Sequence, residues 1–192
     1  MVSVVPFLPS FRWYASLLQS RRDNLTEAEA IASTNEALHM AGKGFARCSI
    51  RERDKERSLA VAIAGGNASL KRVNHIPSAT LSEHGDWRHN HLKTFEAIYG
   101  KMPFFTEVYP LLKNCYEEMY EESLASFNRR LHEALLSILL PSPDSLHHHL
   151  PEIARERGLE LADSIHPDLS LLDSIMCFGP ETLLPLLVWK EK

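Results

Sequence analysis

The second half of the chain carries helical periodicity almost without interruption, and this pattern limits the fold more than any other feature. From Asp86 onward, apolar residues recur every three or four positions, as in Leu124, Phe127 and Leu131. Helices are therefore predicted at about 87–100, 103–121, 124–138, 153–157, 169–177 and 180–188. The side chains expected in the core are Trp87, Phe95, Phe127, Leu131, Leu135 and Leu172.

The first half adds a β component after two predicted helices at about 11–18 and 26–40. Strands are predicted at 45–51, 59–64 and 70–76, and the N-terminal segment 2–8 is a candidate fourth strand. The charged segment RERDKER between the first two of these strands is expected to be a hairpin loop. Because the connections are too short for crossover helices, the pairing should be antiparallel. The sequence thus predicts one α+β domain over 1–192, with a small antiparallel sheet packed against a mostly helical C-terminal half.

Composition excludes several classes of function. The chain of 192 residues has a net charge of −4 and no long run of Lys and Arg, so no nucleic-acid partner is expected. Its three cysteines, Cys48, Cys115 and Cys177, are far apart in sequence, which argues against a disulfide framework and against a CxxC zinc site. Reduced thiols in a reducing compartment are the expected state.

The ends of the chain favour a cytoplasmic protein. The N-terminal stretch has no basic region followed by a long apolar run, so it does not have the pattern of a signal peptide. The apolar stretch 183–189 is interrupted by Pro185 and is far shorter than the roughly 20 residues that a membrane span needs. No membrane span is therefore predicted.

The segment HGDWRHNH, residues 84–91, is the densest group of chemically active side chains. His89 and His91 are two residues apart, so on a helix their side chains point about 200° apart and cannot share a metal ion. His91 lies on the same helical face as Trp87 and Phe95. It is either a core histidine with a hydrogen-bonded ring or a general acid or base in a partly buried pocket. The sequence leaves both interpretations open.

Cys48 is a candidate nucleophile because it follows Arg47 on a predicted strand. A reactive thiol needs a base or a positive environment, which Lys43, Arg47 and His91 would supply only if the fold brings them together. The alternative is a small buried apolar side chain. No metal site is predicted, since the histidines at 147–149 lie in a Pro-rich loop with no second cluster nearby. No glycine-rich phosphate loop occurs, and the cofactor, if any, stays unknown.

Four ordered stretches carry a family resemblance. FLPSFRWYASL is similar to a YLPWxGYF pattern, and KGFARCSI is similar to a KxxYRNRCxI strand. The pattern W-x3-H-x7-Y-x3-P-F-F is carried by Trp87, His91, Tyr99, Pro103, Phe104 and Phe105. The late stretch DLSLLDSIMCFGPETLL is similar to a closing D-x-S-x-L-D motif followed by G-P-E. Together they resemble the WbqC-like family of bacterial proteins.

This resemblance implies a connection with bacterial surface polysaccharides. Members of the family occur in gene clusters for O-antigen synthesis, and a glycine-transferase role has been suggested for one. The chain departs from the pattern near its N-terminus: Ser10 replaces a tryptophan, Ala46 replaces an asparagine, and 3–6 replaces a Gln-Pro sequence. Since these losses fall at polar positions, any family activity is expected to be altered or absent here.

Two functions of different classes follow. The first is an intracellular enzyme of O-antigen biosynthesis that transfers an acyl or aminoacyl group. His91 would then be the catalytic acid or base, in a pocket beside Lys43 or Arg47. Those two cations would bind an anionic small molecule or sugar nucleotide, and Trp87 and Tyr99 would wall the pocket. The second is a non-catalytic binding or scaffold protein of the same pathway, in which the aromatic residues are core. A metal enzyme is disfavoured because the ligand spacing fails.

Overall fold

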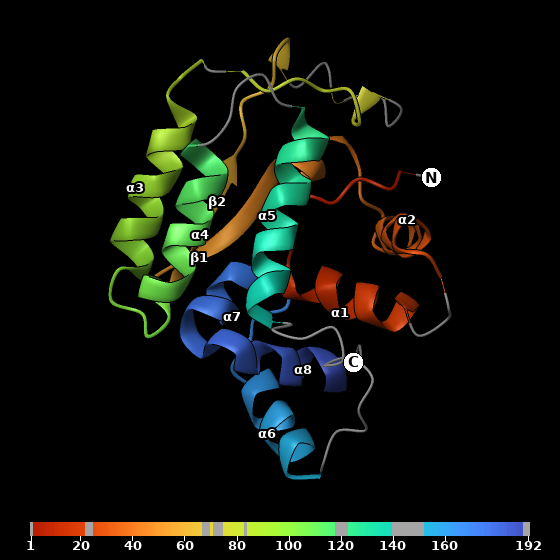
Figure 1. The fold of residues 1–192 in the computed structure, drawn as a ribbon, viewed down its shortest axis with the longest axis vertical. Helices are drawn as coiled ribbons and strands as arrows, with labels where there is room; N and C mark the ends of the chain where they lie inside the picture. Colours follow the sequence, from red (N-terminus) through yellow and green to blue (C-terminus); the bar gives the residue numbers. More distant parts are fainter. Residues whose placement is uncertain are drawn as a thin grey trace.

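A two-stranded antiparallel sheet and a series of helices make up the chain in the computed structural model, which describes residues 2–21, 25–66, 70, 75–82, 84–117, 123–139 and 152–189 (Figure 1). The first half contains α1 (Phe11–Arg21), α2 (Glu27–Ala37), the 3-10 helix η1 (Gly42–Ala46), β1 (Arg47–Glu52) and β2 (Lys55–Ala60). The second half contains α3 (Trp87–Tyr99), α4 (Phe105–Glu117), α5 (Leu124–Leu139), α6 (Glu152–Ala162), α7 (Leu171–Phe178), the 3-10 helix η5 (Gly179–Thr182) and α8 (Leu183–Val188). The predicted α+β class with a mostly helical C-terminal half is confirmed.

The β-hairpin differs from its prediction in where the strands run. The charged segment 51–57 was expected to be a loop, but only Arg53 and Asp54 form the turn. Arg53 adopts a positive φ of 57°, and beyond the turn Arg57 pairs with Glu52 at 3.2 Å. Charged side chains suit these strands because most of β2 faces water. The strand predicted at 59–64 leaves the sheet after Ala60.

The other predicted strands are not part of this sheet. Of the segment 70–76, residues 71–74 lie outside the described residues, and the described remainder is not in a strand. The N-terminal segment 2–8 is not assigned to a strand either, although the Phe7 amide donates to the Phe45 carbonyl at 3.2 Å. The expected three- or four-stranded sheet is therefore a two-stranded hairpin within the described part of the chain.

Two buried asparagines hold the N-terminal segment in place. The side-chain amide of Asn128 on α5 donates to the carbonyls of Val5 and Phe45, at 2.9 and 2.8 Å. The side-chain amide of Asn35 on α2 donates to the carbonyls of Val2 and Val4, at 2.8 and 2.9 Å. Because a buried carbonyl needs a partner, these side chains replace the sheet ladder that the segment lacks. The segment is thereby fixed between α2, α5 and η1.

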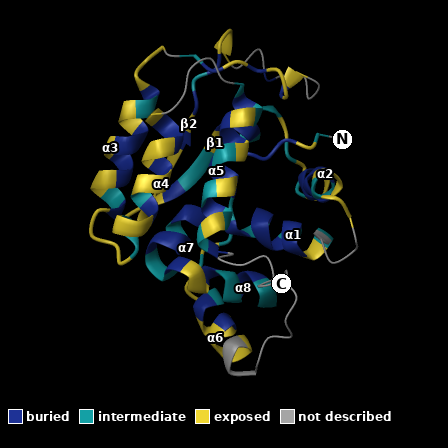
Figure 2. Ribbon diagram, in the orientation of Figure 1, coloured by how far each residue is buried: buried dark blue, intermediate teal, exposed yellow. Residues whose placement is uncertain are grey.

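Helix α5 lies at the centre of the molecule, with the hairpin behind it in Figure 1. Its apolar stripe is buried, and its opposite face is exposed to solvent (Figure 2). Phe127 is fully buried among Trp87, Tyr116 and Phe7, with ring centroids 5.2 to 6.0 Å apart. The six residues predicted to be core are all buried: Trp87, Phe95, Phe127, Leu131, Leu135 and Leu172. The periodicity thus identified the correct helix faces.

The C-terminal helices close the core from one end. Helix α6 packs against α8, and α7 contacts β1. Among the described residues, the continuous helical stretch Leu171–Val188 is long and apolar enough to cross a membrane by length and composition alone, with a mean hydropathy of 1.5. Half of that stretch is buried inside the fold, and one stretch of this kind is weak evidence for a membrane span.

Candidate functional site

A cleft of about 800 Å³ opens between the N-terminal segment and the β-hairpin. This volume lies within the range of about 300–1,000 Å³ that is typical of small-molecule sites. One wall is formed by the N-terminal segment and the start of α1, and the other by the hairpin and the turn after α2. Its lining comprises residues 6–10, 12–13, 37–40, 44, 47–49, 58, 168 and 170.

The hairpin wall presents a polar strip to the cleft. Arg47 and Ser49 are two residues apart on β1, so they share one face of the strand, and Ser58 on β2 pairs with Ser49 in register. All three residues line the cleft. Within the described part of the chain, no acidic side chain pairs with the exposed Arg47. A guanidinium beside two hydroxyls is suited to a phosphate or carboxylate, which accepts several hydrogen bonds at once.

The opposite wall carries an ion pair. Arg12 Nε lies 3.0 Å from Asp168 Oδ1, and both residues line the cleft. The Asp168 side chain is 61% exposed, so it has room to contact a ligand. His39, which follows α2, also lines the cleft and adopts a positive φ of 51°. Counting Arg12, Arg47 and Asp168, the cleft has two cations and one anion, which favours an anionic ligand.

The backbone amides at the helix starts beside the cleft are already satisfied. At the start of α1, the Phe11 amide donates to Leu169 and the Arg12 amide donates to Pro167, at 3.0 and 2.9 Å. At the start of α7, the Leu171 amide donates to the carbonyl of Pro9 at 2.9 Å. Helix N-termini often bind anions through such amides, but here the amides are occupied. Recognition of a ligand therefore depends on side chains.

Cys48 lines the same cleft, between Arg47 and Ser49. Burial raises the pKa of its thiol, and the negative charge of Asp173 raises it further, while a hydrogen bond with the backbone of Leu59 opposes both effects. The neutral thiol is therefore favoured at neutral pH, and a thiolate nucleophile is not. Cys48 and Arg47 both belong to the cleft lining but are consecutive on β1, so their side chains point to opposite faces of the strand, and the thiol is not activated.

Cys48 is accordingly expected to react slowly with iodoacetamide at pH 7.5. A thiol of ordinary pKa, near 8.5, is already several per cent thiolate at this pH, so alkylation of Cys48 should be more than about tenfold slower than that of free cysteine. Time-resolved peptide mass spectrometry would measure the rates for the three cysteines separately. Alkylation of Cys48 as fast as that of free cysteine would instead indicate a thiolate and restore it as a nucleophile.

The other predicted site residues occupy different places. Lys43 is exposed in η1, beside Gly44, which lines the cleft. Trp87 and Tyr99 are buried on α3, with exposures of 6% and 1%. The indole nitrogen of Trp87 donates to the carbonyl of Ser82 at 2.7 Å. None of Lys43, Trp87 and Tyr99 belongs to the cleft lining. These three residues therefore do not line the same cleft as Arg47.

His91 lies in an aromatic cluster under the cleft. Its ring is 5% exposed and stacks on Phe7, which separates it from the cleft, at a centroid distance of 5.7 Å. Nδ1 lies 3.1 Å from the hydroxyl of Tyr116, and the imidazole also hydrogen-bonds the backbone of Ala60. Burial lowers the pKa of His91 to about 4; the bond to Ala60 opposes this shift, and the charge of Arg57 adds to it.

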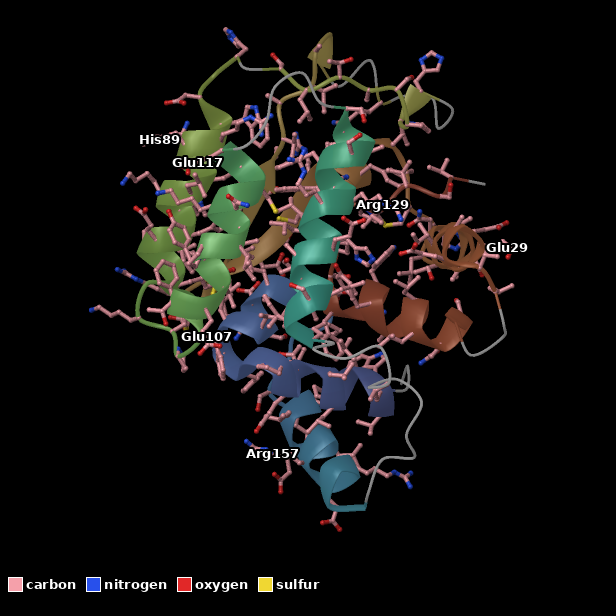
Figure 3. All side chains as sticks on the ribbon, in the orientation of Figure 1. Glu29, His89, Glu107, Glu117, Arg129 and Arg157 are labelled. Carbon is pink, nitrogen blue, oxygen red and sulfur yellow. The ribbon has the colours of Figure 1, made fainter. Side chains whose placement is uncertain are left out.

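The expected opening of His91 onto a cavity beside Lys43 or Arg47 is thus not observed. The physical reason is that Trp87, Phe95 and Tyr116 enclose the ring on the core side, with centroid distances of 5.3 to 6.4 Å. The catalytic role assigned to His91 stays a prediction, while its position is that of a core residue. His89 lies on the outer side of α3 (Figure 3), in agreement with the divergence expected of two histidines two residues apart.

Asp173 is a half-buried acid to which the sequence pattern assigned no role. Its Oδ1 accepts hydrogen bonds from the Arg51 amide and the Tyr99 hydroxyl, both at 3.0 Å. Burial raises the pKa of Asp173 to about 6, although these two hydrogen bonds and the charge of Arg51 act to lower it. Its Oδ2 is buried, with no hydrogen-bond partner among the described residues.

The sequence that forms this site matches a known protein family. The model of the WbqC-like protein family matches residues 23–147, which is more than half of the chain. The chain belongs to the WbqC-like protein family. The match includes the hairpin wall and His91, whereas Phe7, Arg12, Asp168 and Asp173 lie outside it. No curated protein and no solved structure matches the chain significantly.

Metal binding finds no support in the described part of this WbqC-like chain. No group of three or more His, Cys, Asp or Glu side chains comes together among the described residues in a way that could hold a metal ion. The histidines at 147–149 lie outside the described residues. The side-chain groups on which ligand binding in the cleft can depend are therefore guanidinium, hydroxyl and carboxylate groups.

Proposed function

We propose that this WbqC-like protein binds an anionic small molecule of the sugar-nucleotide class in the Arg47 cleft, as a cytoplasmic component of bacterial surface-polysaccharide (O-antigen) biosynthesis. The observation that carries the proposal is Arg47, which lines an 800 Å³ cleft beside Ser49 and Ser58 without a described acidic partner. A cation without a carboxylate partner in a concave site favours an anionic ligand. Family membership supports the pathway.

Binding is favoured over catalysis because the two groups proposed for chemistry are not prepared for it. The pKa of the Cys48 thiol is raised, and His91 is enclosed behind Phe7. The second candidate function is transfer of an acyl or aminoacyl group from such a ligand. It is favoured by one observation, that Cys48 lines the cleft directly beside Arg47.

The proposal predicts that Arg47→Ala weakens binding of UDP-N-acetylglucosamine by about tenfold or more. A charge-assisted hydrogen bond typically contributes about 1.5–3 kcal/mol, and tenfold corresponds to about 1.4 kcal/mol. Isothermal titration calorimetry would compare the wild type with the variant. Titrations with UDP and with inorganic phosphate would show how much of the affinity comes from the anionic group alone.

Lys55→Ala is a matched control for this experiment. Lys55 is exposed at the start of β2 and does not line the cleft. Its removal should change the dissociation constant by less than about twofold, because exposed charges at a distance are screened by salt. Equal losses in both variants would indicate non-specific charge attraction. Failure of all three probes to bind the wild type at millimolar concentration would reject the proposed function.

A further inference from the structure

The start of α7 closes the edge of β1 that β2 leaves free. The amide of Ser170 donates to the carbonyl of Ser49 at 2.7 Å. Two residues along β1, the amide of Arg51 donates to Asp173 Oδ1 at 3.0 Å. The same oxygen accepts the Tyr99 hydroxyl at 3.0 Å, which ties this edge to α3. Asp173 is thus the side chain through which β1 is joined to the helical half.

The same short segment is also joined to the opposite wall of the cleft. The amide of Leu171 donates to Pro9, and the carbonyl of Leu169 accepts from Phe11, at 2.9 and 3.0 Å. Ser170 forms an isolated antiparallel bridge with Ser10. Residues 169–173 therefore stand between the hairpin wall and the N-terminal wall, and their attachments set how far apart the walls are.

We propose that Asp173 is a positioning residue for the cleft, whose carboxylate holds β1 so that Arg47 and Ser49 face the Arg12 wall, and that protonation of this carboxylate weakens ligand binding. The inference rests on the proposed function, because that function supplies the anionic ligand. Its mechanism rests on the contacts of Asp173. Asp173 does not line the cleft, so it acts through β1 and not by touching the ligand.

The surroundings of Asp173 explain why its protonation matters near neutral pH. Burial raises its pKa to about 6, which outweighs the opposing effects of the Arg51 amide, the Tyr99 hydroxyl and the Arg51 charge. The other titratable groups close enough to interact with it are Cys48 on β1 and Cys177 on α7, whose own pKa values the Asp173 charge raises. Groups on α1, α4 and η5 are not among the causes of its shift.

Protonation changes the strength of the hydrogen bonds that hold β1. With an ionised carboxylate, the bonds from Arg51 and Tyr99 to Oδ1 are charge-assisted, and such bonds are roughly twice as strong as neutral ones. When Asp173 is protonated, both become neutral. The edge of β1 is then held less firmly, and Arg47 and Ser49 are less well placed to meet an anionic group.

The first arm of the test needs no ligand. In ¹⁵N–¹H NMR spectra recorded from pH 4.5 to 8, the amides of Arg51, Ser49 and Arg47 should shift together with a midpoint near pH 6. In Asp173→Asn, whose side chain keeps an acceptor oxygen but has no charge, these shifts should vanish. Titration of Arg51 without Ser49 and Arg47 would overturn the inference, because the effect would end at the hydrogen bond itself.

The second arm measures affinity for UDP-N-acetylglucosamine, a probe whose diphosphate charge is constant over this pH range. The measurement is made in the His39→Asn background, so that Asp173 is tested without the histidine that lines the cleft. Affinity should fall about three- to tenfold from pH 7.5 to pH 5, in line with the loss of charge assistance in two hydrogen bonds. Adding Asp173→Asn should give the lower affinity at every pH.

The outcomes separate this inference from the proposed function. If Arg47→Ala abolishes binding while Asp173→Asn leaves affinity and its pH profile unchanged, the proposed function stands and the positioning role is rejected. If the wild type does not bind the probe, the proposed function fails, and the NMR arm alone decides whether Asp173 controls the position of β1. Asp173→Glu provides a check on folding, since it keeps the charge but displaces the carboxylate.

Discussion

Phe127→Ala is expected to lower the free energy of unfolding by about 3–5 kcal/mol, the usual cost of removing a core phenylalanine. The side chain is fully buried, and its ring touches Trp87, Tyr116 and Phe7 at centroid distances of 5.2 to 6.0 Å. These neighbours belong to α3, α4 and the N-terminal segment, so a cavity here would loosen three contacts at once. Urea unfolding followed by circular dichroism would measure the loss.

Glu133→Ala is the matched control for that substitution. Glu133 is exposed on the opposite face of α5 and pairs only at the surface with Arg129, at 3.0 Å. Surface ion pairs of this kind contribute about 0–1 kcal/mol, so the control should stay within about 1 kcal/mol of the wild type. A loss below about 1 kcal/mol for Phe127→Ala itself would show that the apolar stripe of α5 does not face the core.

The helices were predictable because their burial repeats with the helical period. The stripe from Leu124 to Leu139 is buried at every third or fourth position, and Pro141 follows it in the sequence. The second helix was predicted to begin at 26, and Thr26 caps α2 there, with both hydrogen bonds of a capping box to Glu29 present. Such signals are local, since each depends on residues within one or two turns.

The hairpin and the cleft were less predictable because they depend on distant segments. Strands β1 and β2 carry charges on their exposed faces, so they lack the apolar alternation by which strands are recognised. The cleft combines Arg12 and Asp168, which are 156 residues apart in sequence, with Arg47. One signal was present: Asp168 and Asp173 both belong to the closing motif that carries part of the family resemblance.

His91 was placed in a pocket because its sequence neighbours are rich in His and Trp, but the same pattern also describes an aromatic core. What separates the two is the position of Phe7, which stacks on the imidazole from a segment more than 80 residues away in the sequence. The helical periodicity gives the face of α3 on which His91 lies. It does not show which residues from elsewhere in the chain cover that face.

The burial of His91 predicts a loss of stability in acid. Its pKa is about 4 in the folded chain, against an ordinary value of 6.5, because burial disfavours the charged ring. The unfolded chain therefore takes up this proton at a higher pH than the folded chain does. The stabilising contribution of neutral His91 is complete above pH 6.5 and is lost as the pH falls towards 4. A gap of this size corresponds to about 3 kcal/mol.

Asp173 acts in the opposite direction, so the wild-type profile alone does not isolate His91. The pKa of Asp173 is raised from 3.8 to about 6, so its contribution to stability is complete below pH 3.8 and is lost as the pH rises through 6. The experiment is therefore made in the Asp173→Asn background. In that background, the free energy of unfolding is compared between His91 and His91→Gln, a side chain that does not titrate.

The difference in unfolding free energy between these two chains is expected to shrink by about 3 kcal/mol from pH 7 to pH 4, because only the chain with His91 must keep a buried imidazole neutral. Urea unfolding at half-unit pH steps would give the curve, and Tyr116→Phe would show how much of it depends on the hydroxyl 3.1 Å from Nδ1. A difference that does not change with pH would mean that His91 titrates as if it were in water. Its ring would then have to reach solvent in the folded protein, and the acid–base role would again become the better explanation for a histidine at this position.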